Sequence, residues 1–357
     1  MVTCCVNKVE PHNRLKLPIM EALPPELLFP ILQWAPKEMF NGTIALVCWQ
    51  WRDVVRSRSM QHFLFSNRFY AYEKKWILPK TLGRHTADIH VLAFGQDGRI
   101  YLGSTDCTIR VWSDIDETHP QTLEGHTGGV LALAVGLDGR IYSGSGDKTI
   151  RVWSGTDGTH LQTLEGHTQS VLALAVGLDS RIYSGSGDLT IRVWSGTNGT
   201  HLQTLNGHTW GVSALAVGHD GRIYSGSWDH TICVWSGTDG THLQTLTGHT
   251  QSVCALAVGL DGRIYSGSAD HTIRVWSGTD GTHLQTLKGH TADINALAIG
   301  KDGRIYSGSW DGTIRVWIGA DGTHLQTPRG HTQYVFALTV GQDGRIYSGS
   351  EMKVNIW

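Results

Sequence analysis

Histidine is the side chain in this sequence best suited to chemistry near neutral pH, and the 357 residues include 19 of them. An imidazole can bind a metal ion or transfer a proton. Thirteen fall into two sets with a constant spacing of 41 residues: His85, His126, His167, His208, His249, His290 and His331; and His119, His160, His201, His242, His283 and His324. Each copy belongs to a different unit of a repeat, so the copies cannot converge on one ion. We expect no metal site and no cofactor.

Aspartate recurs with the same period, which bears on acid–base catalysis. The repeated carboxyls are Asp106, Asp147, Asp188, Asp229, Asp270 and Asp311. Their Gly- and Ser-rich surroundings are typical of turns rather than of paired catalytic carboxylates. The units are near copies and offer no convincing pair of an unlike acid and base. We therefore expect a non-catalytic protein, with an enzyme that uses the centre of the repeat array as the disfavoured alternative.

Overall composition excludes several other classes of function. The chain has 29 Lys and Arg against 31 Asp and Glu, a net charge of −2. This balance argues against a broad surface for nucleic acid or an anionic membrane. There is no apolar run long enough to span a bilayer, no signal-peptide core, and the six Cys lack disulfide-framework or metal-ligand spacing. We expect a cytoplasmic or nuclear location, or both.

The repeat itself predicts the fold. Tryptophan recurs every 41 residues and then once after 40, which defines seven units: Trp112, Trp153, Trp194, Trp235, Trp276, Trp317 and Trp357. The unit that begins at His126 contains four short runs typical of strands, at 130–135, 140–145, 149–153 and 160–164. The first run is wholly apolar, so we expect it to be buried between neighbouring sheets. Seven four-stranded sheets arranged radially form a β-propeller.

The ends of the repeat region predict how the ring closes. The chain stops at Trp357, on the third strand of the seventh unit, which therefore lacks its fourth strand. Residues 80–82 align with residues 162–164, a fourth strand. We expect residues around 78–82 to complete the last sheet, because an open row of sheets would leave a bare edge.

Each unit carries the pattern GHTGGV…DGRIYSGSGDKTIRVW, and residues 80–357 resemble the WD-repeat family. The resemblance implies a buried network of the Gly-His histidine, the turn Asp, a strand Ser (Ser143 or Ser145 in the second unit) and the strand Trp. In three units these are His126, Asp147, Trp153; His167, Asp188, Trp194; and His208, Asp229, Trp235. The seventh unit departs, because one residue is missing and Glu351 takes the place of the Asp.

The first 79 residues have a different character. Residues 1–19 are a polar tail, residues 20–65 show helical spacing of apolar residues, and residues 66–79 form a linker. The stretches LPPEL at 23–27 and ALVCWQWRDVV at 45–55 resemble the F-box. Pro30 departs from this resemblance, because it lies inside the expected first helix and removes a backbone hydrogen bond there. The predicted fold class is therefore mainly β: a seven-bladed propeller preceded by a small α-helical F-box.

This combination resembles the substrate receptors of SCF-type ubiquitin ligases. The resemblance implies that the F-box docks on a Skp-type adaptor, and through it on a cullin scaffold, while the propeller holds a protein substrate. Candidate adaptor contacts are the apolar residues Leu23, Pro24, Ile31, Leu32, Val47, Cys48 and Trp51. The alternative is a WD-repeat scaffold with no ubiquitin role.

Comparison of the units with one another predicts where a partner binds. The two positions after Gly-His-Thr and the positions flanking the turn Asp vary, and both lie at the same end of a sheet. They carry Asp88, Trp210, Trp228, Asp293, Trp310 and Tyr334, whose aromatic members are candidate anchors. No Arg occupies these positions, so we expect aromatic or apolar recognition rather than a phosphate clamp.

Overall fold

The computed structural model describes residues 80–357, apart from 83–84, 114–115, 320, 329–330 and 332. The predicted tail at 1–19, the F-box at 20–65 and the linker at 66–79 lie outside the described residues. So do the candidate adaptor contacts, Leu23 to Trp51.

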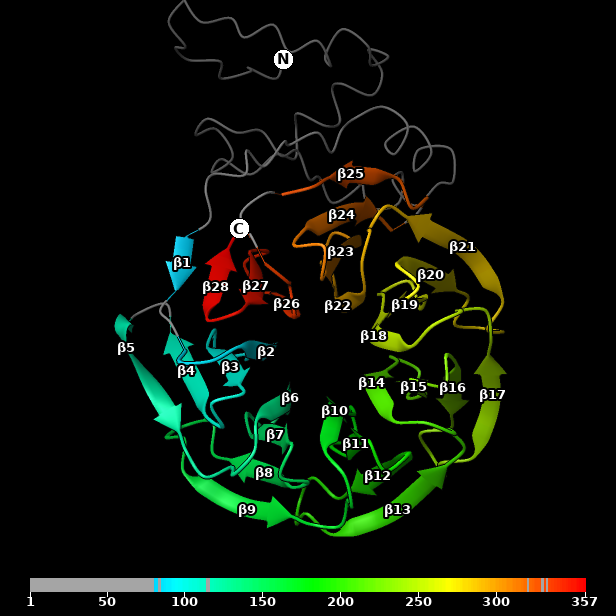
Figure 1. Ribbon diagram of the computed structural model, residues 1–357. Helices are drawn as coiled ribbons and strands as arrows, with labels where there is room; N and C mark the ends of the chain where they lie inside the picture. The colour runs from blue at the N-terminus through cyan, green and yellow to red at the C-terminus, as the bar shows by residue number, and fades with distance from the viewer. Residues whose placement is uncertain (1–79, 83–84, 114–115, 320, 329–330, 332) are drawn as a thin grey trace, which may run out of the picture. The chain divides into compact units, whose positions relative to one another are not determined.

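Seven four-stranded antiparallel sheets stand around a common axis, which confirms the predicted propeller (Figure 1). We number the sheets as blades 1 to 7 and name the strands of each blade a to d, from the axis outward. Blades 1 to 3 contain β2 Ile89–Phe94, β3 Ile100–Ser104, β4 Ile109–Ser113 and β5 Asp116–Leu123; β6 Val130–Val135, β7 Ile141–Ser145, β8 Ile150–Trp153 and β9 His160–Leu164; and β10 Val171–Val176, β11 Ile182–Ser186, β12 Thr190–Trp194 and β13 His201–Asn206.

Blades 4 to 7 repeat this order, except that the outer strand of blade 7 comes from the start of the described chain. Their strands are β14 Val212–Val217, β15 Ile223–Ser227, β16 Ile232–Trp235 and β17 His242–Leu246; β18 Val253–Val258, β19 Ile264–Ser268, β20 Thr272–Trp276 and β21 His283–Lys288; β22 Ile294–Ile299, β23 Arg304–Ser309, β24 Ile314–Ile318 and β25 His324–Gln326; and β26 Ala337–Val340, β27 Ile346–Ser350, β28 Lys353–Ile356 and β1 Lys80–Leu82.

Strand b, rather than strand a, is the most deeply buried strand of each blade. All five residues of β7 are buried, whereas three of the six residues of β6 remain partly exposed. Strand a lies between the inner strands of the neighbouring blades, as expected, but it is only partly buried. Strand a lies nearest the ring axis, where the sheets converge and no further strand covers it (Figure 1). Strand b has a strand on either side of it and a neighbouring blade against each face.

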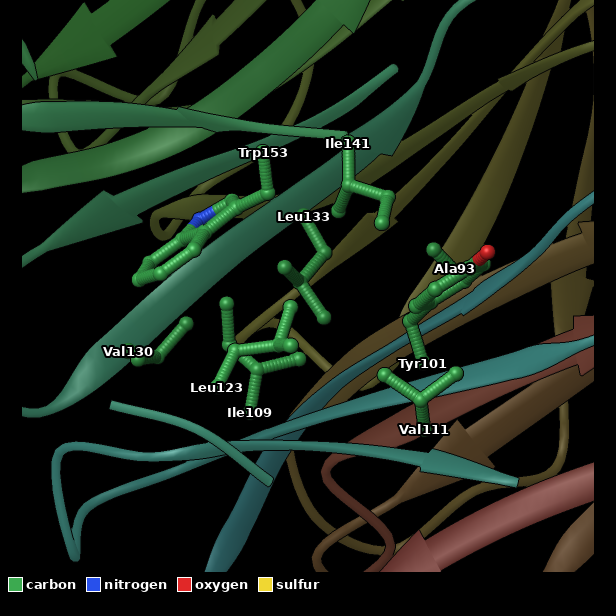
Figure 2. Packing of buried hydrophobic residues seen from close by; sticks show 9 residues of the cluster. All are labelled: Ala93, Tyr101, Ile109, Val111, Leu123, Val130, Leu133, Ile141 and Trp153. Atoms are coloured by element: carbon green, nitrogen blue, oxygen red, sulfur yellow. The ribbon is translucent and has the colours of Figure 1, made fainter. Parts of the chain in front are cut away.

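Each pair of adjacent blades shares its own apolar core. Between blades 1 and 2, Tyr101, Ile109 and Val111 pack with Val130 and Trp153 and with four further buried side chains (Figure 2). The blades approach closely because strand b contains a glycine. A Cβ on Gly144 would come 2.6 Å from Cγ1 of Val171 in the next blade, well inside van der Waals contact.

The ring closes where the two ends of the described chain meet. Strand β1 pairs antiparallel with β28, with Lys80 opposite Ile356, Thr81 opposite Asn355 and Leu82 opposite Val354 (Figure 1). Blade 7 thereby gains its fourth strand from residues that lie before blade 1 in the sequence. We call blades 7 and 1 the seam.

The end of the ring that carries the a–b and c–d turns is uniform from blade to blade, and we call it the uniform face. Arg140 Nη1 donates a hydrogen bond of 2.8 Å to the Gly196 carbonyl of the next blade. Arg181 makes the same contact to Gly237 at 2.8 Å. These bonds link neighbouring blades and leave little reason for the turn sequence to vary.

Candidate protein-interaction face

The opposite end of the ring carries the d–a loops and the b–c turns, and we call it the variable face. A buried polar network lies beneath it in each of blades 2 to 6. In blade 2, His126 Nδ1 lies 2.7 Å from Asp147 Oδ2, His126 Nε2 lies 2.7 Å from Ser143 Oγ, and Trp153 Nε1 donates to the same Oγ at 2.8 Å. Ser143 is thus the hub of the network, while Ser145 bonds to the Gly128 carbonyl instead.

The same atoms meet in the other two blades singled out from the sequence. His167 lies 2.8 Å from Asp188, and Trp194 donates to Ser184 at 2.8 Å. In blade 4 the matching contacts join His208 to Asp229 and Trp235 to Ser225, both at 2.8 Å. The sequence pattern therefore identified groups that do come together within each blade.

The turn carboxylates are fully used by this network. Besides His126, Asp147 accepts hydrogen bonds from the backbone N–H groups of Thr127 and Thr149 and from the Thr149 hydroxyl. Burial favours a higher pKa for Asp147, but the hydrogen bonds from Thr149 and His126 outweigh it and lower the pKa to about 2. A carboxylate held in this way fixes a turn and is poorly placed to bind a metal or to transfer protons. No group of His, Cys, Asp or Glu in the described part of the chain could hold a metal ion.

The environment of the network histidine favours the neutral imidazole in blades 2 and 3. Burial lowers the pKa of His126 and of His167, although the neighbouring Asp raises it. A neutral imidazole that donates from Nδ1 to the Asp must accept at Nε2, which matches the serine hydroxyl found there. The network therefore joins the d–a loop to the b–c turn and holds the variable face in place.

Blade 1 lacks the hub of the network, a departure that the sequence analysis missed. Leu102 occupies the serine position on β3 and is completely buried. As a result, His85 Nε2 and Trp112 Nε1 are buried without a hydrogen-bond partner. The signal was visible as IYLGS where the other units read IYSGS.

Blade 7 keeps the hub but lacks the carboxylate. His331 Nε2 lies 2.6 Å from Ser348 Oγ, and Trp357 Nε1 donates to the same oxygen at 2.7 Å. Among the described residues, Glu351 does not replace the missing Asp at His331; it is exposed, and its carbonyl accepts from Ile89 N at 2.6 Å. Burial lowers the pKa of His331 to about 4.

Blade 4 carries a second change that the sequence analysis missed. Cys233 stands where the other complete blades have Arg on strand c, and its Sγ lies 3.8 Å from His208 Nδ1. Burial lowers the pKa of His208, but hydrogen bonds to Asp229 and Cys233 outweigh burial and leave this pKa raised. The sequence shows this change directly, because residues 232–235 read ICVW where the other complete units read IRVW.

The predicted anchors are exposed on the variable face. Trp210, Trp228, Trp310 and Tyr334 are 59%, 40%, 42% and 50% exposed. Backbone hydrogen bonds link the two variable columns: Trp228 N donates to the Gly211 carbonyl, and Trp310 N donates to the Asp293 carbonyl at 2.9 Å. Asp88 and Asp293 are both partly exposed.

The structure brings two of the predicted anchors together and separates the others. The rings of Trp310 and Tyr334 lie 5.6 Å apart, and both contact Phe336, at 6.4 and 6.1 Å. The ring of His90 lies 5.0 Å from the ring of Phe336. We call Trp310, Tyr334, Phe336 and His90 the aromatic ridge; it runs from blade 6 across blade 7 to blade 1. In the described chain, Trp210 and Trp228 make no contact with another aromatic ring.

Two members of the ridge were not predicted. Phe336 and His90 occupy equivalent positions in blades 7 and 1, directly after Val335 and Ile89. The residue at this position also varies between units. Phe336 was overlooked because an apolar residue there looks like core. The contact between His90 and Phe336 depends on ring closure, since 246 residues separate them in the sequence.

The sequence matches one family model seven times along the propeller. The family described as WD domain, G-beta repeat matches residues 76–113, 117–154, 158–195, 199–236, 240–277, 281–317 and 322–357. No F-box is detected in the chain, and no curated protein matches it. No helix in the described ranges is long and apolar enough to cross a membrane. Seven matches that together span most of the chain, and the seven blades they delimit, show that this chain belongs to the WD-repeat family.

Proposed function

We propose that this chain is the substrate-recognition subunit of an SCF-type ubiquitin ligase. In this proposal the variable face of the propeller binds a protein substrate, and residues 20–65 dock on a Skp-type adaptor and through it on a cullin scaffold. The observation that carries the binding role is the concentration of exposed aromatic side chains on one end of an otherwise uniform ring. A propeller of this family is suited to protein–protein interaction.

The ligase role rests on the sequence of residues 20–65. The chain would act without chemistry of its own, by raising the local concentration of a substrate lysine near a conjugating enzyme. The apolar residues Leu23, Ile31 and Trp51 are the proposed core of the adaptor contact, since charged substitutions there would bury an unpaired charge.

The test is co-purification of the full chain with a purified Skp-type adaptor. We expect the intact chain to retain the adaptor and the double variant Leu23→Asp, Ile31→Asp to lose it. Trp310→Ala is the matched control, because it changes the propeller and should leave adaptor binding intact.

Failure of the intact chain to retain the adaptor would overturn the ligase role. It would favour the second candidate, a WD-repeat scaffold that binds proteins without a ubiquitin function. That candidate rests on the same variable face and needs no adaptor.

A further inference from the structure

The aromatic ridge has an acidic residue near each end, Asp293 in blade 6 and Asp88 in blade 1. Asp293 lies at the Trp310 end, where its carbonyl accepts from Trp310 N. Asp88 precedes His90 by two residues at the other end. Exposed Glu351 lies beside Asp88, because the Glu351 carbonyl accepts from Ile89 N. An aromatic face flanked by negative charge attracts a cation.

The spacing of the rings decides which kind of cation fits. Ring centroids 5.0 to 6.4 Å apart are in direct contact, so no space is left between them for a quaternary ammonium group. A cation must therefore lie on the outer faces of the rings. A planar guanidinium can stack flat on such a face while its N–H groups reach a carboxylate, which a compact ammonium cannot do equally well.

We propose that the aromatic ridge is a binding site for an arginine side chain in an exposed segment of a partner protein. The guanidinium stacks on the outer face of Trp310, and Asp293 pairs with it from the side. His271 Nε2 lies 3.8 Å from Asp293 Oδ1, so the arginine displaces or shares this contact. The proposal rests on the protein-binding role of the variable face and specifies the chemistry of the partner.

The direct test measures binding of a short fluorescent peptide, Gly-Ala-Arg-Ala-Gly with blocked ends, to the full chain by anisotropy. Two matched peptides replace the Arg by Lys or by citrulline, which has the shape of Arg but no charge. We expect the Arg peptide to bind at least about 10-fold more tightly than either, since charge and stacking both contribute. Equal binding of the Arg and citrulline peptides would overturn the proposal, and equal binding of the Lys peptide would overturn the assignment to arginine.

Variants of the chain then locate the site. Trp310→Ala and Asp293→Asn should each weaken binding of the Arg peptide by roughly 10-fold. Trp228→Ala is the matched control, because Trp228 occupies the same position of the b–c turn in blade 4 and is 40% exposed against 42% for Trp310. Circular dichroism melts show whether each variant stays folded.

A loss of binding in Trp228→Ala equal to that in Trp310→Ala would contradict the proposed site, as would the absence of binding at millimolar peptide. The adaptor experiment above is independent of the ridge. If the adaptor binds and the Arg peptide does not, the arginine site is wrong and the ligase role stands; the reverse result would retain the site and remove the ligase role.

Discussion

Blades 2 to 6 and the two seam blades use the same architecture in different ways. Each of blades 2 to 6 contains the complete network of His, Asp, Ser and Trp, at nearly constant distances. Blade 1 lacks the Ser and blade 7 lacks the Asp. Three of the four ridge residues, Tyr334, Phe336 and His90, lie in the seam blades. The comparison teaches that the complete blades maintain the ring, whereas the seam combines incomplete networks with the most distinctive surface.

The difference has an energetic consequence. A buried N–H without a partner loses its hydration and gains nothing in return, at a cost of about 1–3 kcal/mol. Blade 1 contains one such N–H, at Trp112 Nε1, and also a buried acceptor without a partner, His85 Nε2. We therefore expect the ring to open first at the seam, where the chain ends also meet.

The largest expected effect comes from removing the closing strand. Deletion of residues 1–83 removes β1 and leaves the edge of β28 unpaired. We expect the free energy of unfolding to fall by more than about 3 kcal/mol, from lost strand pairing and lost closure of the ring. Deletion of residues 1–65 retains β1 and should leave the stability of the propeller unchanged. Equal thermal melting of the two truncations would contradict the role of the seam.

Removal of a network carboxylate in a complete blade should have the next largest effect. Asp188→Ala deletes the acceptor of His167, Thr168 and Thr190, and should destabilise the protein by about 3 kcal/mol. Glu351→Ala is the matched change in the seam, where no network is lost, and should cost less than about 0.5 kcal/mol. Urea unfolding measures both. Similar shifts would show that the seam is not different.

The sequence predicts features that lie within one repeat unit better than contacts between blades. The period of 41 residues predicts seven blades, because every blade repeats the same local pattern. Which His, Asp and Trp meet is implied by the resemblance to the WD-repeat family, and they lie within one unit. The missing hub at Leu102 and the change at Cys233 were present as breaks in otherwise constant columns. The contact of His90 with Phe336 could not be found in this way, because it joins blades from opposite ends of the sequence.

Acidification provides a prediction for His331 of blade 7, whose pKa is lowered by a large amount. The pKa of His331 is lowered to about 4 in the folded protein, against about 6.5 in an unfolded chain. Between these values the unfolded chain binds a proton that the folded chain does not, so stability is lost as the pH falls from 6.5 toward 4. We expect His331 to contribute roughly 2 kcal/mol of this loss.

His331→Gln removes the titrating group, and its stability should depend less steeply on pH over the same window. The carboxylates of the complete blades act at lower pH, because their lowered pKa values lie below the ordinary value of 3.8. Thermal melting at pH 7, 5.5 and 4 compares the two proteins. A parallel pH dependence of wild type and variant would contradict the assignment to blade 7.

The smallest expected effect concerns the b–c turn of the complete blades. Lys148 follows the turn Asp with a φ of 73°, a left-handed conformation that strains a side chain with a Cβ. Blade 6 has Gly312 at this place, with a φ of 77°. Lys148→Gly should stabilise the protein by about 0.5 kcal/mol, and Gly312→Ala should destabilise it by about 1 kcal/mol. Destabilisation by Lys148→Gly, or stabilisation by Gly312→Ala, in urea unfolding would show that this turn is not strained.

The central claim is that the complete blades maintain the ring and the aromatic ridge binds the partner. Hydrogen–deuterium exchange of the full chain, with and without a bound partner protein, tests it most directly. The account predicts that the partner slows exchange at residues 86–90, 291–294, 310–313 and 333–336, which carry the ridge together with Asp88 and Asp293. Protection confined to the uniform face, at turns such as 136–139, or to the variable face of blades 2 to 5, would contradict it.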